Sequence, residues 1–241
     1  MKFNGTAKCI DDEDLPRIGA KIGVGEDEIH AVLDVETRGG GFDSRGRPKM
    51  LFEPHIFYRE LSGNDRENAV ALGLAYRKWG TKCYPKDSYA RLAEAIKIDE
   101  NAALRSASWG LGQIMGFNHK LAGYPSARKM VLAFLDDEES HLEAMVEFII
   151  ASGLDDDMRN HDWRGFARGY NGAGYAKHGY HLKLAKSHAK WVKIPDTPLV
   201  MDRTPDKPEA NLYSNDMNTY RAMTTEQAER LAKMIGELSF L

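Results

Sequence analysis

The chain has 241 residues, of which 42% are hydrophobic and 29% charged, with a formal net charge of -3 and a mean hydropathy of -0.51. This composition is typical of a globular protein and excludes wholesale disorder and a fibrous repeat. No apolar run reaches the roughly 18–20 residues of a membrane-spanning helix, so we expect no stable membrane insertion, and the net charge argues against a nucleic-acid-binding protein.

The N-terminal segment lacks the apolar stretch of a secretory signal and becomes acidic within its first dozen residues. Its cysteine, Cys9, and the only other one, Cys83, are too few for a disulfide framework or a four-thiolate zinc site. We therefore expect two reduced packing residues, with a single Cys9–Cys83 bridge as the alternative.

The first strong helical pattern covers Glu26–Glu36. It opens with three acids, which suit the positive end of a helix dipole, and then places Ile29, Val32, Leu33 and Glu36 on one face. The glycine-rich stretch 38–48 cannot continue this helix, and its turn residues favour a small β-hairpin that ends in the segment 49–53.

The rest of the main body is predicted to be helical. The clearest pattern is Glu138–Ala151, where Leu142, Met145, Val146 and Ile149 lie on one apolar stripe. Other helices are predicted at Pro54–Leu61, Asp65–Trp79, Ser88–Leu104, Ser126–Phe134, Trp163–Tyr170 and His181–Val192.

The sequence changes character near Ile194, after a basic stretch from Arg159 to Lys193 that is typical of a solvated helix face. Four prolines between Pro195 and Pro208 exclude a continuous helix and indicate a linker. A short amphipathic helix is predicted at Thr225–Leu238. We therefore predict a domain over 1–194 and a C-terminal extension over 195–241.

Glu36 is the first residue that could carry chemistry. It shares an apolar helical face and stands just before a glycine-rich break. A carboxyl that is partly removed from water has a raised pKa and stays protonated nearer neutral pH, which is what a general acid needs. The alternative is a glutamate at a frayed helix end that points into water.

Glu53, at the end of the predicted hairpin, is a second acidic candidate. Two carboxyl groups held in different environments are the working parts of most glycoside hydrolases. Glu53 also precedes Pro54, so it is equally suited to cap the helix that begins there.

Two glycine-rich segments complete the candidate site. In residues 106–115, glycines would let a ligand approach the backbone, and the Gln113 amide could hydrogen-bond a sugar substituent; the alternative is a tight connection between helices with Trp109 in the core. In residues 169–175, Tyr170 and Asn171 fit a rim that binds sugar rings.

Together these segments resemble a known family. Residues 35–57 (VETRGGGFDSRGRPKMLFEPHIF) are similar to the signature of N-acetylmuramidase endolysins from tailed phages that infect Gram-negative bacteria, and 108–115 (SWGLGQIM) and 170–174 (YNGAG) resemble motifs of the lysozyme and lytic-transglycosylase superfamily. The resemblance covers about residues 11–192. It implies a mainly α (α+β) lysozyme-like fold with a small β-hairpin lobe.

The resemblance also implies a function. The expected enzyme is a glycoside hydrolase that cleaves the β-1,4 bond between N-acetylmuramic acid and N-acetylglucosamine in peptidoglycan glycan strands, without a cofactor. Glu36 matches the catalytic acid of the family and Glu53 its second acidic position; Gln113, Tyr170 and Asn171 would bind substrate. Many members carry a separate peptidoglycan-binding module, which the extension 195–241 does not resemble.

Several alternatives stay open at this stage. A lytic transglycosylase would cut the same bond with one carboxylate, and a structural phage-tail component would bind cell wall through the same fold, docking a phage-particle partner with its C-terminal extension. A zinc amidase is disfavoured because no His-Glu-x-x-His motif or other convincing metal-ligand set appears, so we expect no metal. A free endolysin would be a monomer held in the host cytoplasm until a holin-type pore releases it to the cell wall; a virion-associated enzyme is the alternative.

Overall fold

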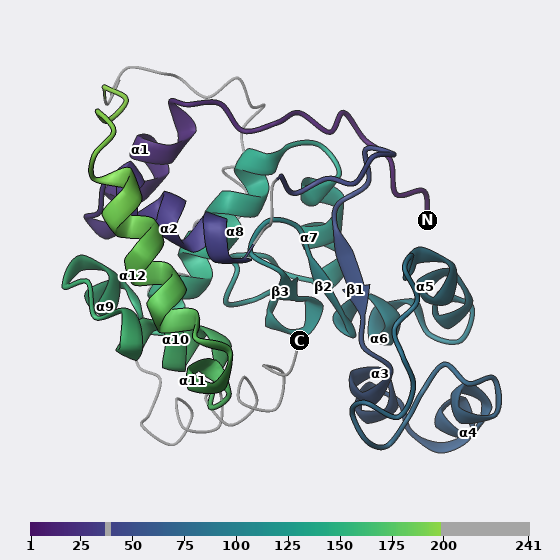
Figure 1. Cartoon of the computed structure of the whole chain (residues 1–241). Helices are drawn as coiled ribbons and strands as arrows, with labels where there is room; N and C mark the ends of the chain where they lie inside the picture. The colour runs from purple at the N-terminus through teal and green to yellow at the C-terminus, as the bar shows by residue number, and fades with distance from the viewer. Residues whose placement is uncertain (37–39, 199–241) are drawn as a thin grey trace. The chain divides into compact units, whose positions relative to one another are not determined.

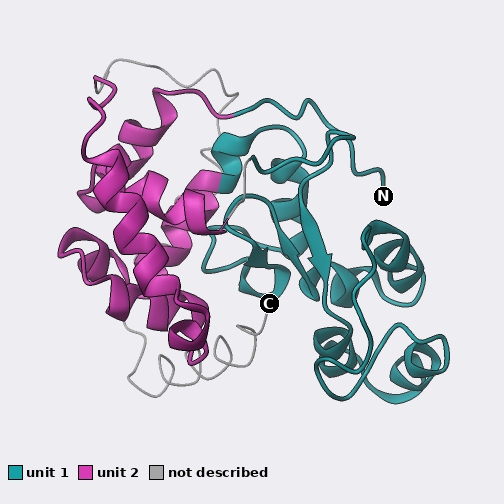
Figure 2. Ribbon diagram, viewed as in Figure 1, with its two compact units in different colours: residues 1–9, 40–141 teal, residues 10–39, 142–241 magenta. Residues whose placement is uncertain are grey.

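The computed structural model describes residues 1–36 and 40–198, which form two compact units (Figure 2). Unit 1 contains residues 1–9 and 40–141, and unit 2 contains residues 10–39 and 142–241. The stretch 1–194, which we predicted as one domain, is thus divided between the two units. The predicted domain boundary near Ile194 stays a prediction. Most of the predicted linker and the helix Thr225–Leu238 lie outside the described residues.

Unit 1 combines short helices with a small antiparallel sheet (Figure 1). The strands β1 (Met50–Phe52), β2 (Ala107–Trp109) and β3 (Ile114–Met115) lie in the order β1-β2-β3, with Met50 opposite Trp109 and Phe52 opposite Ala107. The helices are α3 (Pro54–Glu60), α4 (Gly63–Ala71), α5 (Tyr89–Ile96), α6 (Glu100–Arg105) and α7 (Ala127–Phe134), with a 3-10 turn η2 (Gly116–Asn118).

The predicted hairpin is smaller than expected. Phe42 and Pro48 form an isolated antiparallel bridge around the turn in which the Asp43 amide donates to the Arg47 carbonyl. The partner strand of β1 is instead β2, which pairs in turn with β3; both lie in the segment 106–115 that we had interpreted as a turn or a helix connection. A turn is present at residues 110–113, but the strands on either side of it were not predicted. Trp109 is fully buried in the core, as the alternative interpretation expected.

Two predicted helices of unit 1 are shorter than expected. The helix predicted at Asp65–Trp79 ends at Ala71, because Gly73 adopts a left-handed conformation (φ 70°) and its amide bonds the Val70 carbonyl. The helix predicted at Ser88–Leu104 is divided into α5 and α6. Asp99 is extended between them and its carboxylate caps α6 by accepting from the Ala102 amide at 2.9 Å.

Unit 2 is helical. It contains α1 (Asp14–Gly19), η1 (Ala20–Ile22), α2 (Glu26–Glu36), α9 (Asp155–Arg159), α10 (Trp163–Asn171), α11 (Tyr175–His178) and α12 (Tyr180–Trp191), and it receives most of α8 (Glu138–Ala151), which begins in unit 1. The predicted bounds of α2 and α8 are confirmed, and α10 and α12 agree within one residue.

Helices α2 and α12 pack side by side in unit 2 (Figure 1). Ile29 and Val32 of α2 and Leu184 of α12 are completely buried. On the face of α2 that contacts α12, the His30 ring stacks on Trp191 with centroids 3.6 Å apart, and Asp34 accepts a hydrogen bond from the Ser187 hydroxyl at 2.6 Å. This packing fixes the position of α2, the helix that ends in Glu36.

The cysteines do not pack as expected. Cys9 and Cys83 both belong to unit 1, are exposed and carry free thiols. The expectation that they are reduced is confirmed, whereas the expectation that they fill the core was wrong. Within residues 1–36 and 40–198, no helix is long and apolar enough to cross a membrane.

Candidate active site

Glu36 is the last residue of α2, and its carboxylate is held by unit 2 itself. The Asn171 side-chain amide, at the end of α10, donates a hydrogen bond to Glu36 Oε1 at 2.8 Å. Burial raises the pKa of Glu36 by more than the Asn171 hydrogen bond and the positive charge of Lys183 lower it. The interpretation of Glu36 as a solvated, frayed helix end therefore does not fit this environment.

Tyr170 contributes to the low polarity around Glu36. Its ring stacks on Phe166 with centroids 5.3 Å apart, and the ring of Phe148 meets it edge-on at 5.7 Å. Burial, together with the negative charge of Glu36, raises the pKa of Tyr170 well above its ordinary value. The phenol stays protonated, so the aromatic group beside Glu36 is neutral at every pH at which the enzyme would act.

Asn171 is nine-tenths buried and has capacity for another partner. Its Nδ2 is used by Glu36, while its buried Oδ1 finds no hydrogen-bond partner among the described residues. Since a buried polar atom without a partner is costly, this oxygen is suited to accept a hydrogen bond from a ligand. Of the predicted site residues, Glu36, Tyr170 and Asn171 are thus brought together in unit 2.

A shallow groove of about 520 Å³ lies next to this group in unit 2. Its lining comes from α2 and α12, with Asp34, Val35, Lys183, Lys186, Ser187 and Lys190 as the lining residues. Lys183 lines this groove, and its positive charge lowers the pKa of the Glu36 carboxyl group.

Lys183→Met should raise the pKa of Glu36 further, since it removes a positive charge that favours the carboxylate. A general acid works in its protonated form, so the alkaline limb of the pH profile of kcat/KM should move to higher pH while the acid limb stays in place. The measurement is that profile at constant ionic strength, with Lys186→Met as the matched control from the same groove. A move to lower pH, or an equal move in the control, would contradict this role.

Glu53 lies in unit 1, between β1 and α3. Its backbone amide donates to the Ser106 carbonyl at 2.8 Å, and its side chain is only 2% exposed. Glu53 occupies the N-cap position of α3, but its side chain makes no capping hydrogen bond. Instead its Oε2 accepts from the Tyr84 hydroxyl at 2.5 Å and lies 3.1 Å from His55 Nδ1, without the alignment of a hydrogen bond.

The carboxylate of Glu53 also acts on its partner. Burial, then the hydrogen bond and the charge of Glu53, raise the pKa of Tyr84. Neither Tyr84 nor His55 was singled out in the sequence. Tyr84 stands in a segment without helical or strand periodicity, so no pattern in the sequence linked it to Glu53.

Gln113 lies in the turn between β2 and β3, also in unit 1. Its backbone is left-handed (φ 47°), and its amide accepts from the Ser108 hydroxyl and donates to the Gly110 carbonyl, both at 2.9 Å. Gly110 is required here, because its φ is 68° and a Cβ would approach the His141 ring to 2.8 Å. The Gln113 amide stiffens this turn. Its Nε2 donates to the carbonyls of Gly110 and Lys49, so it retains one lone pair of Oε1 for a ligand.

Gln113 and Glu53 are not brought together within unit 1. Gln113 Nε2 approaches the carbonyl of Lys49, before the start of β1, whereas Glu53 follows its last residue. At about 3.3 Å per strand residue, these two backbone positions are separated by roughly 13 Å.

Comparisons with known proteins agree with this architecture. The model of the N-acetylmuramidase family (Muramidase) matches residues 26–192. Among solved structures, the chain is similar to the crystal structure of the Burkholderia AP3 phage endolysin, with 36% sequence identity and a TM-score of 0.71 over 77% of this chain and 73% of that one. None of the curated proteins matches the chain. The family match spans the helix that carries Glu36, the strand before Glu53 and the motifs around Gln113 and Asn171, and the chain belongs to the N-acetylmuramidase family, with a mainly helical, lysozyme-like fold and a small sheet.

Proposed function

We propose that Glu36 is the general acid with which this N-acetylmuramidase hydrolyses peptidoglycan. The observation that carries the proposal is the environment of its carboxyl group: burial raises its pKa, and a buried amide, Asn171, binds it directly. The carboxylic acid would protonate the oxygen that leaves when the β-1,4 bond between N-acetylmuramic acid and N-acetylglucosamine breaks.

Asn171 and Lys183 would assist the release of the proton from Glu36. When Glu36 gives up its proton, negative charge develops on its carboxylate, and both groups favour that charged form. Burial raises the pKa of Glu36, so the proton is retained to higher pH than on a solvated glutamate, and these two groups allow it to leave. The balance between them is what makes a carboxyl group a useful acid.

Asn171→Leu tests the proposed part of the amide. It removes the donor to Glu36 and the free Oδ1 while nearly keeping the side-chain volume. A hydrogen bond to a charged group is worth about 1.5–3 kcal/mol, so kcat/KM should fall about 10–100-fold. The alkaline limb should also move to higher pH, because a group that lowers the pKa of Glu36 is lost. An unchanged pH profile in the folded variant would mean that Asn171 does not act on Glu36.

We further propose Glu53 as the second carboxylate and Gln113, Tyr170 and Asn171 as substrate contacts. Support for Glu53 comes from the resemblance of residues 35–57 to the endolysin signature. Its side chain is also buried, and its carboxylate accepts a hydrogen bond from the Tyr84 hydroxyl. Asn171 has the unused Oδ1, Tyr170 lies close enough for its pKa to respond to Glu36, and the Gln113 amide has only part of its hydrogen-bonding capacity left.

Analysis of the products distinguishes the possible reactions. Purified protein acting on Gram-negative sacculi should release muropeptides with new reducing ends, and mass spectrometry should find N-acetylmuramic acid ends that contain the added water. Products lighter by one water would identify the anhydro ends of a lytic transglycosylase. Binding to sacculi without release of muropeptides would leave only a wall-binding role.

The proposed place of action follows from the substrate. As an endolysin, the protein would act as a monomer on the cell wall after release from the host cytoplasm through a holin-type pore. The alternative is delivery as part of a phage particle, with the extension 195–241 as the docking segment. Fractionation of a lysate that contains the phage particles separates them, because only a virion component would copurify with intact particles.

A further inference from the structure

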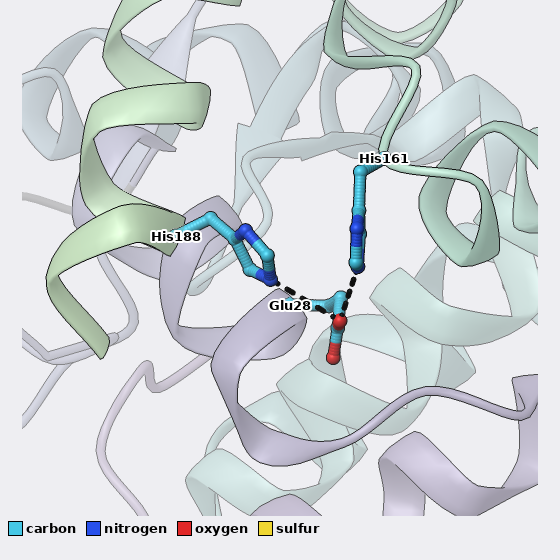
Figure 3. A group of neighbouring side chains, drawn as sticks. All are labelled: Glu28, His161 and His188. Atoms are coloured by element: carbon cyan, nitrogen blue, oxygen red, sulfur yellow. Dashed lines mark hydrogen bonds and ion pairs between the residues drawn. The ribbon is translucent and has the colours of Figure 1, made fainter. Parts of the chain in front are cut away.

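Three side chains from three separate segments of unit 2 converge in one cluster (Figure 3). Glu28 lies in the first turn of α2, His161 in the loop between α9 and α10, and His188 in α12. Glu28 Oε1 is 2.6 Å from His161 Nε2 and 3.3 Å from His188 Nε2. Eight residues at about 1.5 Å per residue place Glu28 roughly 12 Å along α2 from Glu36, so this cluster is separate from the proposed acid.

We propose that Glu28, His161 and His188 form a binding site for one divalent transition-metal ion, best matched by Zn²⁺. Two imidazole nitrogens and one carboxylate oxygen are a donor set that Zn²⁺ commonly takes, with water as the fourth ligand. One donor atom from each side chain lies within 4.8 Å of the others. Bonds of about 2.0–2.1 Å in a tetrahedral site place donor atoms about 3.3 Å apart.

The present distances need small movements to meet that geometry. The Glu28–His188 separation of 3.3 Å already fits, whereas the Glu28–His161 separation of 2.6 Å must open by about 0.7 Å. The donor atoms of the two histidines lie within 4.8 Å of each other, so the same movement of His161 also sets their separation. His161 can make this movement, since its side chain is 46% exposed and that of Glu28 only 12%. The exposed side of His161 also gives an ion its route of entry and leaves room for the water ligand.

The surrounding groups hold the ligands in place. The Gly25 amide donates to the second oxygen of Glu28 at 2.9 Å, which orients the carboxylate and leaves Oε1 toward the histidines. The Trp163 ring lies parallel to His161, with centroids 5.7 Å apart, and is 5.2 Å from the His188 ring. The imidazoles are therefore packed rather than freely rotating.

The backbone at His161 supports a role for this ring. His161 has a positive φ of 53°, a conformation that is uncommon outside glycine, although asparagine, aspartate and histidine adopt it more often than other residues. Strained backbone of this kind persists where the surrounding structure requires one side chain at one position. Here it directs the imidazole to Glu28, which lies 133 positions earlier in the chain.

A bound ion would join α2, α12 and the loop before α10. This role is structural, because none of the three ligands contacts Glu36 or its partner Asn171 in the described structure. Cleavage should therefore continue after the metal is removed, while unit 2 should become less stable. An ion that binds only the folded state raises the Tm, by about 5–11 °C for a chain of this size at a 100-fold excess over Kd.

The test uses the full untagged chain after treatment with a chelator that is then removed. Isothermal titration with Zn²⁺ should give one site per chain, and Co²⁺ should bind there with the visible absorption of a tetrahedral complex. Thermal unfolding with and without Zn²⁺ should show the rise in Tm. Activity on sacculi should be nearly equal in the metal-free and zinc-loaded protein.

Two variants assign the ligands without destroying the fold. His161→Asn keeps a residue that accepts the left-handed backbone, and His188→Gln keeps a hydrogen-bond donor for Glu28. Each should weaken Zn²⁺ binding by more than the roughly 10–100-fold that loss of a supporting partner costs. His181→Gln, on the same helix α12 but outside the cluster, is the matched control and should bind as the parent does.

The results that overturn the proposal are definite. No stoichiometric Zn²⁺ or Co²⁺ binding by the folded parent would show that the cluster is only a hydrogen-bonded carboxylate–histidine group. Equal binding by the parent, His161→Asn and His188→Gln would place the ion elsewhere. Circular dichroism of each variant confirms that the comparison is made between folded proteins.

Discussion

Glu36→Gln is expected to abolish lysis of sacculi while the protein remains folded and continues to bind them. A general acid typically contributes about 10²–10⁴-fold to rate, and the amide of glutamine is not acidic enough to transfer a proton to the leaving oxygen. Glutamine keeps the shape of the side chain and can still accept the Asn171 hydrogen bond. Retention of more than a few per cent of the parent activity would remove Glu36 from the role of acid.

The same substitution should change stability in a direction that depends on pH. Because the pKa of Glu36 is raised in the folded state, ionisation is easier in the unfolded chain. The parent therefore loses stability as pH rises from the ordinary value of 4.5 through the folded pKa, and the Gln variant does not. The difference in free energy of unfolding between Glu36→Gln and the parent should therefore increase in favour of the variant across that window. Above the window the difference should stay constant, and below pH 4.5 the variant should show no such advantage.

A matched control separates burial from catalysis. Glu147, in α8 of unit 2, also has a pKa raised by burial, with Lys21 lowering it and Glu143 raising it. Glu147→Gln should show a stability gain of the same sign in denaturant titrations at several pH values, with activity on sacculi retained. Equal loss of activity in both variants would indicate that the assay reports on stability and not on an acid.

Glu53→Gln is expected to reduce turnover by more than about 100-fold with little change in sacculus binding. The carboxylate charge would be lost, whereas the glutamine oxygen can still accept from Tyr84. Tyr84→Phe makes the complementary change, because it keeps the charge and removes the hydrogen bond. It should cost about 1.5–3 kcal/mol of stability and less than about 10-fold in turnover.

The pair of variants distinguishes a reacting carboxylate from a structural one. If Glu53 served only to anchor Tyr84 and the start of α3, the two variants would lower Tm and activity in parallel. Kinetics and thermal unfolding of both proteins under one buffer condition are sufficient. A Glu53→Gln protein as active as Tyr84→Phe would end the two-carboxylate proposal.

Helices with strong local patterns were predictable from the sequence. Glu26–Glu36 and Glu138–Ala151 combine acids in the first turn with an apolar stripe, and both have the predicted bounds. The sheet was not predictable, since strands of two or three residues carry no periodicity, and β1 pairs with a segment more than fifty positions away. The division at Asp99 could have been found, because an aspartate before a helical run is a capping signal.

The candidate site shows the same limit. Glu36 stood out because its own helix placed it on an apolar face, but its partners Asn171 and Lys183 come from helices far along the chain. Similarly, Glu28, His161 and His188 have no spacing that signals a metal site, and our sequence analysis predicted none. Only the fold places such residues at ligand distance.

The protonation of Glu36 in the folded enzyme is the most direct test of the account. NMR titration of the side-chain carboxyl carbons, with Glu36→Gln to assign the signal, measures its pKa alone. We expect a midpoint above 4.5 that coincides with the alkaline limb of the pH profile of kcat/KM and moves upward in Lys183→Met. A midpoint at or below 4.5, or one unrelated to the activity limb, would contradict the assignment of Glu36 as the buried general acid.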